Sequence, residues 1–155
     1  MTNIVVRVID CHIAYLKDTE PKFLMLKRSP QIIYGGSWQC VTGKIESDEV
    51  PIEAAIRELF EETGLYPINR WTVDQVNHFY EAEFDRMNLI PIFGVEVGSL
   101  KVKLSNEHCD YKWCNIKEAE KLFTWDQQKK GLLSFQEMLT SRTQNSLFQK
   151  FHKIK

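Results

Sequence analysis

The most regular pattern of apolar and polar positions lies in residues 49–63, where it predicts an amphipathic helix. Apolar side chains recur there with the spacing of one helical face, at Ile52, Ala55, Ile56, Leu59 and Phe60. Asp48 can cap the first turn, Pro51 is tolerated inside it, and Gly64 stands where a glycine commonly ends a helix. We therefore expect one well-defined helix that ends at Gly64.

Strand-like stretches precede and follow this helix. β-Branched and aromatic residues are concentrated in a series of short segments, residues 4–9, 12–16, 22–27, 38–41, 71–80, 89–97 and 110–114. Pro91 and Gly94 interrupt one of the most apolar segments, which favours an edge position or a bulge for that strand.

Helical spacing returns near the end of the chain, in residues 116–123 and 126–139. In the second segment Leu132, Phe135 and Leu139 share one face. Strands before and after one central helix, followed by further helices, predict an α+β fold or a layered α/β/α arrangement. The length of 155 residues fits a single domain, residues 1–155.

Composition narrows the classes of function. Lys and Arg number 20 and Asp and Glu 21, which argues against a broadly basic nucleic-acid binder but leaves room for a local phosphate site. No apolar run approaches the roughly 18 residues of a membrane-spanning helix, so we expect no membrane partner. The cysteines form no CxxC pair, which favours free thiols in a reducing cytoplasm over a zinc site built from His108, Cys109 and Cys114.

Acidic residues cluster near the end of the predicted helix. At the helical rotation of about 100° per residue, Glu58, Glu61 and Glu62 fall within an arc of roughly 100° beside the apolar stripe. Like charges at this spacing repel one another, and the negative end of the helix dipole adds to the cost. A solvated acidic face is the simple explanation. A divalent cation would instead neutralise the cluster, and all-oxygen ligands suit Mg²⁺ or Mn²⁺.

The residues around the cluster favour the cation. Residues 43–65 read GKIESDEVPIEAAIRELFEETGL. Every specified position matches the pattern G-x5-E-x7-R-E-U-x-E-E-x-G-U, in which U is a bulky aliphatic residue. This pattern is the Nudix box, and the chain resembles a Nudix hydrolase over its whole length. The resemblance implies the Nudix fold, a mixed β-sheet sandwiched between helices, with the box forming a catalytic loop–helix–loop.

The resemblance also implies roles for individual residues. Glu58, Glu61 and Glu62 match the acidic cluster that binds the divalent metal, with Glu58 and Glu62 as its direct ligands. Arg57 and Glu49 match the pair that braces the loop against the helix, and Gly43 matches the glycine whose backbone lies at the metal site. The implied reaction is attack of an activated water on phosphorus in a nucleoside diphosphate linked to a further group, with the glutamates acting as ligands and base.

Two flanking segments suggest a narrower resemblance. Residues 38–43 read WQCVTG and residues 106–113 read NEHCDYKW. Both resemble the bacterial dihydroneopterin triphosphate pyrophosphatases, also called dATP pyrophosphohydrolases. The second segment also resembles diadenosine tetraphosphate hydrolases, whereas the first favours the pyrophosphatase group. In Nudix enzymes an acid from this second loop often completes the metal site or acts as the base, which makes Glu107 a further catalytic and metal-binding candidate.

Other residues are candidates for substrate binding, each with a simpler alternative. Arg28 and Lys44 are placed to reach a phosphate, although a solvated strand end explains Arg28 equally well. Tyr34 and Trp38, like Phe84 and Trp113, have the flat rings that stack on a purine or pterin, but core packing is the favoured alternative. We expect His108 to hydrogen-bond only locally, and the basic residues after position 149 to form a solvated or frayed tail.

The expected function is a metal-dependent Nudix pyrophosphohydrolase that cleaves a purine or pterin nucleoside triphosphate to a monophosphate and pyrophosphate. A diadenosine polyphosphate hydrolase is the enzymatic alternative. A third hypothesis is a Nudix module that binds a nucleotide without hydrolysing it, and the intact box argues against this hypothesis. The partner is then a small nucleotide or pterin polyphosphate, and the oligomeric state stays open between monomer and homodimer.

Overall fold

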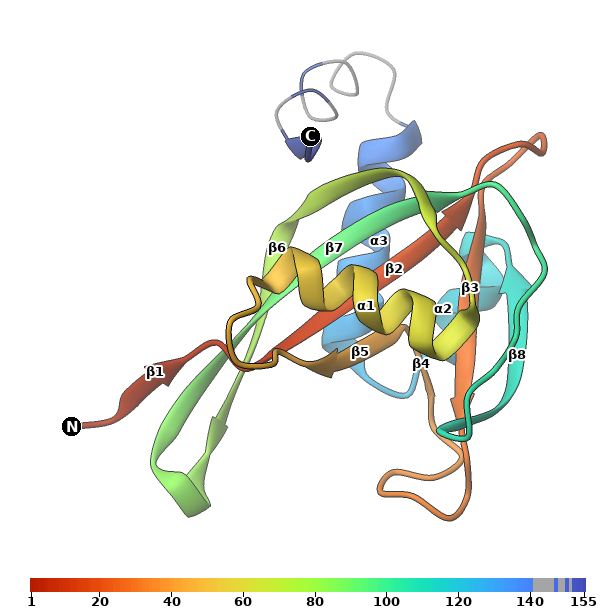
Figure 1. The fold of residues 1–155 in the computed structure, drawn as a ribbon. Helices are drawn as coiled ribbons and strands as arrows, with labels where there is room; N and C mark the ends of the chain where they lie inside the picture. The colour runs from red at the N-terminus through yellow and green to blue at the C-terminus, as the bar shows by residue number, and fades with distance from the viewer. Residues whose placement is uncertain (141–146, 148–149, 151) are drawn as a thin grey trace.

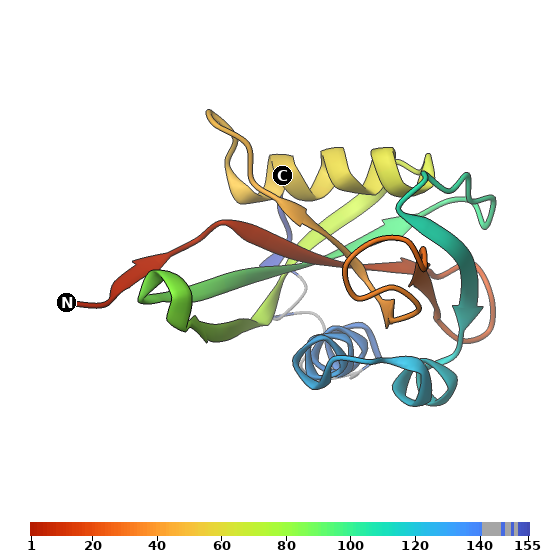
Figure 2. The ribbon, with the colours of Figure 1, turned by 90° about the horizontal axis from the view of Figure 1, so that it is seen from below.

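In the computed structural model, which describes residues 1–140, 147, 150 and 152–155, eight strands form one mixed sheet with helices on both faces. Helix α1 (Pro51–Thr63) covers one face, and helices α2 (Ile116–Leu122) and α3 (Asp126–Thr140) cover the other (Figures 1 and 2). The predicted α+β architecture, a sheet between helices, is therefore confirmed.

The remaining elements follow one another along the chain as β1 (Asn3–Val5), β2 (Val8–Tyr15), β3 (Lys22–Arg28), β4 (Trp38–Gln39), β5 (Val41–Lys44), β6 (Pro67–Glu81), a 3₁₀ turn η1 (Ala82–Phe84), β7 (Arg86–Val97) and β8 (His108–Cys114). Strand β7 runs parallel to β1 and β2 and antiparallel to β6, and β8 pairs with β3.

The two strands β2 and β3 pair only near one end, where Ala14 lies opposite Phe23. Beyond that point the continuous segment of β4 and β5 lies between them, because β4 pairs with β3 and β5 pairs with β2. This arrangement brings Gly43 on β5 next to Ile9 in the middle of the sheet. The start of the box is thereby held directly under α1, which contacts β5.

The side chains of β2 alternate between two cores, which explains why the strand is buried along most of its length. Ile9, Cys11 and Ile13 pack with α1 residues such as Leu59. Ala14 packs on the other face with α3, where Leu132 and Phe135 are fully buried and Leu139 is partly buried, as the helical spacing predicted.

The helix predicted in residues 49–63 is confirmed, but its start differs from the expectation. Gly64 ends it in the left-handed conformation (φ 72°), and its N–H donates to the Phe60 carbonyl at 2.8 Å. Val50, not Asp48, occupies the N-cap position. The Val50 N–H is satisfied instead by the Glu53 carboxylate at 3.1 Å, so a side chain inside the helix replaces the expected cap.

The position of Phe60 is a second departure from the helical pattern. Its side chain belongs to the predicted apolar stripe, yet the residue is 46% exposed. Its ring stacks on Tyr66, which follows the helix, with the ring centres 4.7 Å apart. The last turn of the apolar stripe therefore contacts the next segment of chain rather than the sheet.

The predicted strands are present, but several boundaries and one position differ from the expectation. Residues 4–9 are divided, because β1 ends at Val5 and β2 runs without a break from Val8. The expected edge position of residues 89–97 is wrong, since β7 has partner strands on both sides. Pro91 lies where the pairing with β1 has ended and the pairing with β2 has not begun, and the expected irregularity appears as a register shift in β6 between Thr72 and Val76.

Residues 152–155 are not frayed, because they lie along β6, although Lys153 and Lys155 are solvent-exposed as expected. The Ile154 N–H donates to the Arg70 carbonyl at 2.9 Å, and the Arg70 guanidinium donates to the Lys155 carbonyl at 2.6 Å. Ile154 also packs against the core on the α1 side. Separately, none of the helices within the described part of the chain is both long and apolar enough to span a membrane.

Candidate active site

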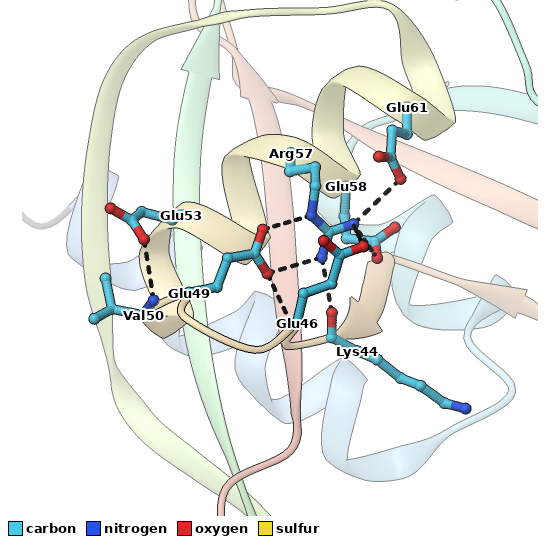
Figure 3. Close-up of polar contacts among 8 residues, drawn as sticks. All are labelled: Lys44, Glu46, Glu49, Val50, Glu53, Arg57, Glu58 and Glu61. Carbon is cyan, nitrogen blue, oxygen red and sulfur yellow. Dashed lines mark hydrogen bonds and ion pairs between the residues drawn. The ribbon is translucent and has the colours of Figure 1, made fainter.

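Arg57 is the central contact between α1 and the loop that precedes it (Figure 3). Its Nε and Nη2 donate to the two carboxylate oxygens of Glu49 at 2.5 and 3.0 Å, and its Nη2 also donates to the Lys44 carbonyl at 2.8 Å. The guanidinium lowers the pKa of Glu49 to about 2. A two-pronged, charged contact of this kind holds the loop in one orientation relative to the helix.

The same guanidinium contacts two of the acidic residues of the predicted metal cluster. Its Nη1 lies 2.9 Å from Glu58 and 3.2 Å from Glu61, and both carboxylates point toward it (Figure 3). The side chain of Glu61 is 54% exposed and that of Glu58 only 14%. Arg57 therefore partly neutralises Glu58 and Glu61 from one side.

Glu62 is in a different situation. The residue is 2% exposed, and neither carboxylate oxygen has a hydrogen-bond partner among the residues that the structure describes. Burial raises the pKa of Glu62 well above its usual value, and the nearby charges of Glu58 and Glu107 raise it further. A buried carboxylate without a partner is costly, and a bound cation removes that cost. This side chain therefore fits a divalent metal.

Gly43 leaves the space that Glu58 occupies. A Cβ atom at position 43 would lie 2.1 Å from Cδ of Glu58, far inside contact distance. Burial is the largest of the influences that raise the pKa of Glu58. The absence of a side chain on β5 thus lets a carboxylate of α1 lie directly against the strand.

The turn before β8 carries Glu107, a further candidate for this cluster. Its backbone carbonyl accepts a hydrogen bond from the Ser29 N–H at 2.9 Å, which fixes the turn to the end of β3. The charge of Glu107 raises the pKa of both Glu58 and Glu62, so its carboxylate lies within their electrostatic range. The structure therefore places Glu107 within electrostatic range of two carboxylates of α1 that are far from it in sequence.

Within the part of the chain that the structure describes, no three His, Cys, Asp or Glu side chains converge on one point at metal-ligand spacing. For the acidic cluster the physical reason is mutual repulsion together with Arg57, which attracts Glu58 and Glu61. The alternative zinc group does not converge either, since Cys114 is buried and Cys109 is exposed.

The two basic candidates for phosphate binding, Arg28 and Lys44, have different surroundings. Arg28 is close enough to Glu62 to lower its pKa, but its Nε is used by the Ile33 carbonyl at 2.9 Å. Arg28 therefore also holds the loop that follows β3. The exposed side chain of Lys44 extends away from the carboxylates (Figure 3), although its carbonyl contacts Arg57.

The aromatic candidates separate into open and packed rings. Tyr34 is 61% exposed, has a left-handed backbone (φ 60°) and meets Trp125 edge to face, with ring centres 5.2 Å apart. Trp38 packs against the core on the α3 side, and the ammonium groups of Lys27 and Lys112 lie 5.9 and 5.2 Å from its ring centre. Tyr34 thus offers an open ring, and Trp38 does not.

The other two aromatic candidates, Trp113 and Phe84, make contacts elsewhere. Trp113 packs in the α1-side core and donates its Nε1–H to the Leu100 carbonyl at 2.9 Å. Phe84 lies in η1 beside the Arg86 guanidinium, at the tip of the β6–β7 hairpin. Core packing is confirmed for Trp113.

Sequence reasoning missed Trp125 and Gln39 beside these groups. Trp125 is the partner of Tyr34, and its signal is a large aromatic residue directly before a helix. Gln39 and His108 form a buried contact at 3.3 Å, so the expectation that His108 bonds only locally is wrong. The signal for Gln39 is a polar residue in a short apolar strand, but nothing in the sequence identifies its partner.

Comparisons with known proteins identify the family to which this fold and the acidic cluster belong. A family model described as NUDIX domain matches residues 9–135, and the chain belongs to this family. It is therefore a hydrolase that acts on phosphorus-containing anhydrides, and Nudix hydrolases generally need a divalent metal.

Individual relatives show the same likeness. The chain is 35% identical over 119 residues to "Dihydroneopterin triphosphate diphosphatase" of Haemophilus influenzae, a match that covers 69% of this chain and 73% of that protein. It is 31% identical over 121 residues, 73% of its length, to "Octanoyltransferase" of Myxococcus xanthus, but the match spans only 32% of that protein. The solved dihydroneopterin triphosphate pyrophosphohydrolase of E. coli has the same fold, with a TM-score of 0.67, 24% identity and coverage of 84% of this chain and 93% of that one.

Proposed function

We propose that the chain is a metal-dependent pyrophosphohydrolase that cleaves a nucleoside triphosphate-like substrate, of the dATP or dihydroneopterin triphosphate type, to a monophosphate and pyrophosphate. The observation that carries the proposal is Glu62, a buried carboxylate without a hydrogen-bond partner among the described residues, inside a complete Nudix box. The substrate class is supported by the WQCVTG segment and by the likeness to the Haemophilus influenzae enzyme.

Glu58 and Glu62 are the direct ligands in this proposal, and Glu61, Glu107 and the backbone at Gly43 complete the metal site. A Mg²⁺ or Mn²⁺ ion held there neutralises polyphosphate charge and makes hydroxide available near neutral pH. Arg57 and Glu49 keep the loop and helix in register through the paired contact between them.

The reaction forms a bond between the oxygen of a water molecule and phosphorus, and it breaks the anhydride bond between the α and β phosphates. A carboxylate of the acidic cluster accepts the proton from water. Arg28, which is already close to Glu62, and Lys44 bind phosphate oxygens, and the exposed ring of Tyr34 contacts the base or pterin. Trp38, whose ring is partly buried, is a second candidate for this contact. A cytoplasmic location belongs to the same proposal, since all the cysteines are free.

A substrate panel tests the proposal. Nucleoside triphosphates including dATP, dihydroneopterin triphosphate, diadenosine tetraphosphate and ADP-ribose are compared by kcat/KM with Mg²⁺, without added pyrophosphatase. We expect a triphosphate to be preferred and pyrophosphate to appear first. Orthophosphate as the first product contradicts the proposed bond cleavage, a preference for diadenosine tetraphosphate selects the alternative enzyme, and binding without turnover selects the non-catalytic module.

A further inference from the structure

A buried hydrogen bond crosses β3 beside the proposed metal site. Leu26 of β3 pairs with Gln39 of β4 and also with Tyr111 of β8, so β4 and β8 lie on opposite edges of β3. The side-chain nitrogen of Gln39 nevertheless lies 3.3 Å from Nε2 of His108, the first residue of β8. Gln39 and His108 are only 3% and 4% exposed. The contact thus connects the two strands that flank β3 by crossing one face of that strand.

The chemistry of this contact determines where the proton of His108 lies. As the two side chains are placed, the amide nitrogen of Gln39 donates to Nε2 of His108, and the imidazole then carries its proton on Nδ1. The Nδ1 atom has no hydrogen-bond partner among the described residues. The ring is therefore held on one side by Gln39.

His108 immediately follows Glu107, so the contact fixes one end of the turn that carries this acid. Ser29 holds the same turn against β3, because it donates its N–H to the Glu107 carbonyl at 2.9 Å and its hydroxyl to the Asn106 carbonyl at 2.8 Å. The pairing of β3 with β8 shifts register between Lys27 and Arg28, at the entrance to β8. Strand pairing alone therefore leaves this entrance irregular, and the Gln39 contact adds a side-chain contact to the hydrogen bonds from Ser29 there.

We propose that Gln39 is a positioning residue that acts through His108 to hold the Glu107 turn against the carboxylates of α1. Glu107 is near enough to Glu58 and Glu62 to raise their pKa. A displaced turn therefore changes the position of the Glu107 carboxylate relative to these two residues. The inference rests on the proposed function, in which Glu107 takes part in metal binding. A merely structural bond between Gln39 and His108 would contribute to stability and leave metal affinity unchanged.

The test measures binding of Mn²⁺ alone to the full chain by calorimetry, for the wild type, Gln39→Met, Glu107→Ala and the double variant. Methionine fills a similar volume and removes the donor. We expect each single change to weaken Mn²⁺ binding by about 10-fold, the usual scale for a group that supports a metal site. We expect the double variant to be no weaker than Glu107→Ala, because Gln39 acts through that residue.

A matched control is Asn77→Leu, which removes a buried amide donor on the α3 side of the sheet, 2.8 Å from Asp10. It should lower the melting temperature without changing Mn²⁺ affinity. Additive losses in the double variant, or an effect of Gln39→Met on stability alone, overturn the inference. A wild-type chain that binds no Mn²⁺ overturns the proposed function as well, whereas intact metal binding and hydrolysis in Gln39→Met overturn only the inference.

Two further measurements do not depend on the folding of Gln39→Met. Nitrogen NMR of the wild-type chain should show His108 neutral at pH 7 with its proton on Nδ1, and a proton on Nε2 contradicts the inference. His108→Gln, whose side-chain carbonyl can accept the Gln39 amide, should keep nearly wild-type Mn²⁺ affinity, whereas His108→Leu should lose it to the extent of Glu107→Ala. Equal affinities in these two variants also overturn the inference.

Discussion

Glu62 and Asp10 are buried to nearly the same extent on opposite faces of the sheet, but their surroundings differ. Glu62 is 2% exposed on the α1 side and Asp10 is 3% exposed on the α3 side. Asp10 accepts hydrogen bonds from Asn77 at 2.8 Å and from Gln128 at 3.3 Å. Glu62 accepts none from the residues that the structure describes, and its charged neighbours include Glu58 and Glu107.

The difference lies in how each carboxylate is stabilised. Asp10 has hydrogen-bond donors around it, whereas Glu62 has the surroundings expected of a metal ligand. Neutral amides from β6 and α3 stabilise Asp10, so burial raises its pKa only to about 6. At Glu62 the surrounding acids add to the cost of burial instead of reducing it. Folding alone gives no reason to place these acids together, and this contrast supports a cation site on the α1 face.

The largest expected effect is that of metal removal. EDTA should reduce hydrolysis to the background rate, and added Mg²⁺ or Mn²⁺ should restore it, because the acidic cluster cannot bind a polyphosphate without a cation. The melting temperature recorded in the same samples shows whether the metal-free chain stays folded. Full activity in metal-free buffer would contradict a catalytic role for a metal bound at Glu62.

Glu62→Gln should lower kcat by at least about 100-fold, the scale for losing a charge-stabilising or acid–base group. Its metal-free melting temperature should rise, because a buried charge is removed. Asp10→Asn is the matched control on the other face and should keep a near wild-type kcat.

Glu61→Gln should also lose activity by about 100-fold on the same grounds. Normal kcat in both glutamate variants would favour a solvated acidic face.

Arg57→Lys tests whether the paired geometry, rather than positive charge alone, organises the α1 side. Lysine cannot reproduce the contacts with Glu49, Glu58 and the Lys44 carbonyl together, so kcat/KM should fall by at least about 10-fold. Glu46→Gln is the control, because Glu46 contacts the same guanidinium only at 3.8 Å with a 65% exposed side chain. Wild-type kcat/KM in Arg57→Lys would show that positive charge alone is sufficient.

Asp10→Asn should change only stability, and only in a defined pH range. The pKa of Asp10 is about 6 in the folded chain against 3.8 as its ordinary value, so stability from this group is full below pH 4 and is lost as pH rises through 6. The variant should therefore gain on the order of 3 kcal/mol relative to wild type between pH 4 and pH 7. Denaturant unfolding at both pH values measures this, and a constant difference would contradict the raised pKa.

Local patterns were sufficient to predict the α1 helix and the Nudix box, because both depend on residues close in sequence. The stripe that ends at Leu59 is buried, and Gly64 terminates the helix as its type suggests. Phe60 fits the same stripe but lies outside the core, since its contact is made by Tyr66 from the following segment. Periodicity identifies a face of a helix without identifying what covers each turn of it.

Contacts between distant segments were beyond sequence reasoning. Arg28 is a candidate for phosphate binding or a solvated strand end, and nothing local indicates that its Nε donates to the Ile33 carbonyl. Nothing local indicates that Gln39 meets His108, or that Asp10 receives amides from β6 and α3. Such pairings depend on strand order and on which face of the sheet each side chain occupies, and these become known only with the fold.

The most direct test of the central claim is the change in melting temperature on adding Mn²⁺ to metal-free wild type, Asp10→Asn and Glu62→Gln. A ligand at about 100 times its dissociation constant stabilises the folded state by about 2.7 kcal/mol. Wild type and Asp10→Asn should both be stabilised on this scale, and Glu62→Gln should gain little. Equal stabilisation of Glu62→Gln and wild type would contradict the claim that the buried carboxylate of Glu62 holds the metal.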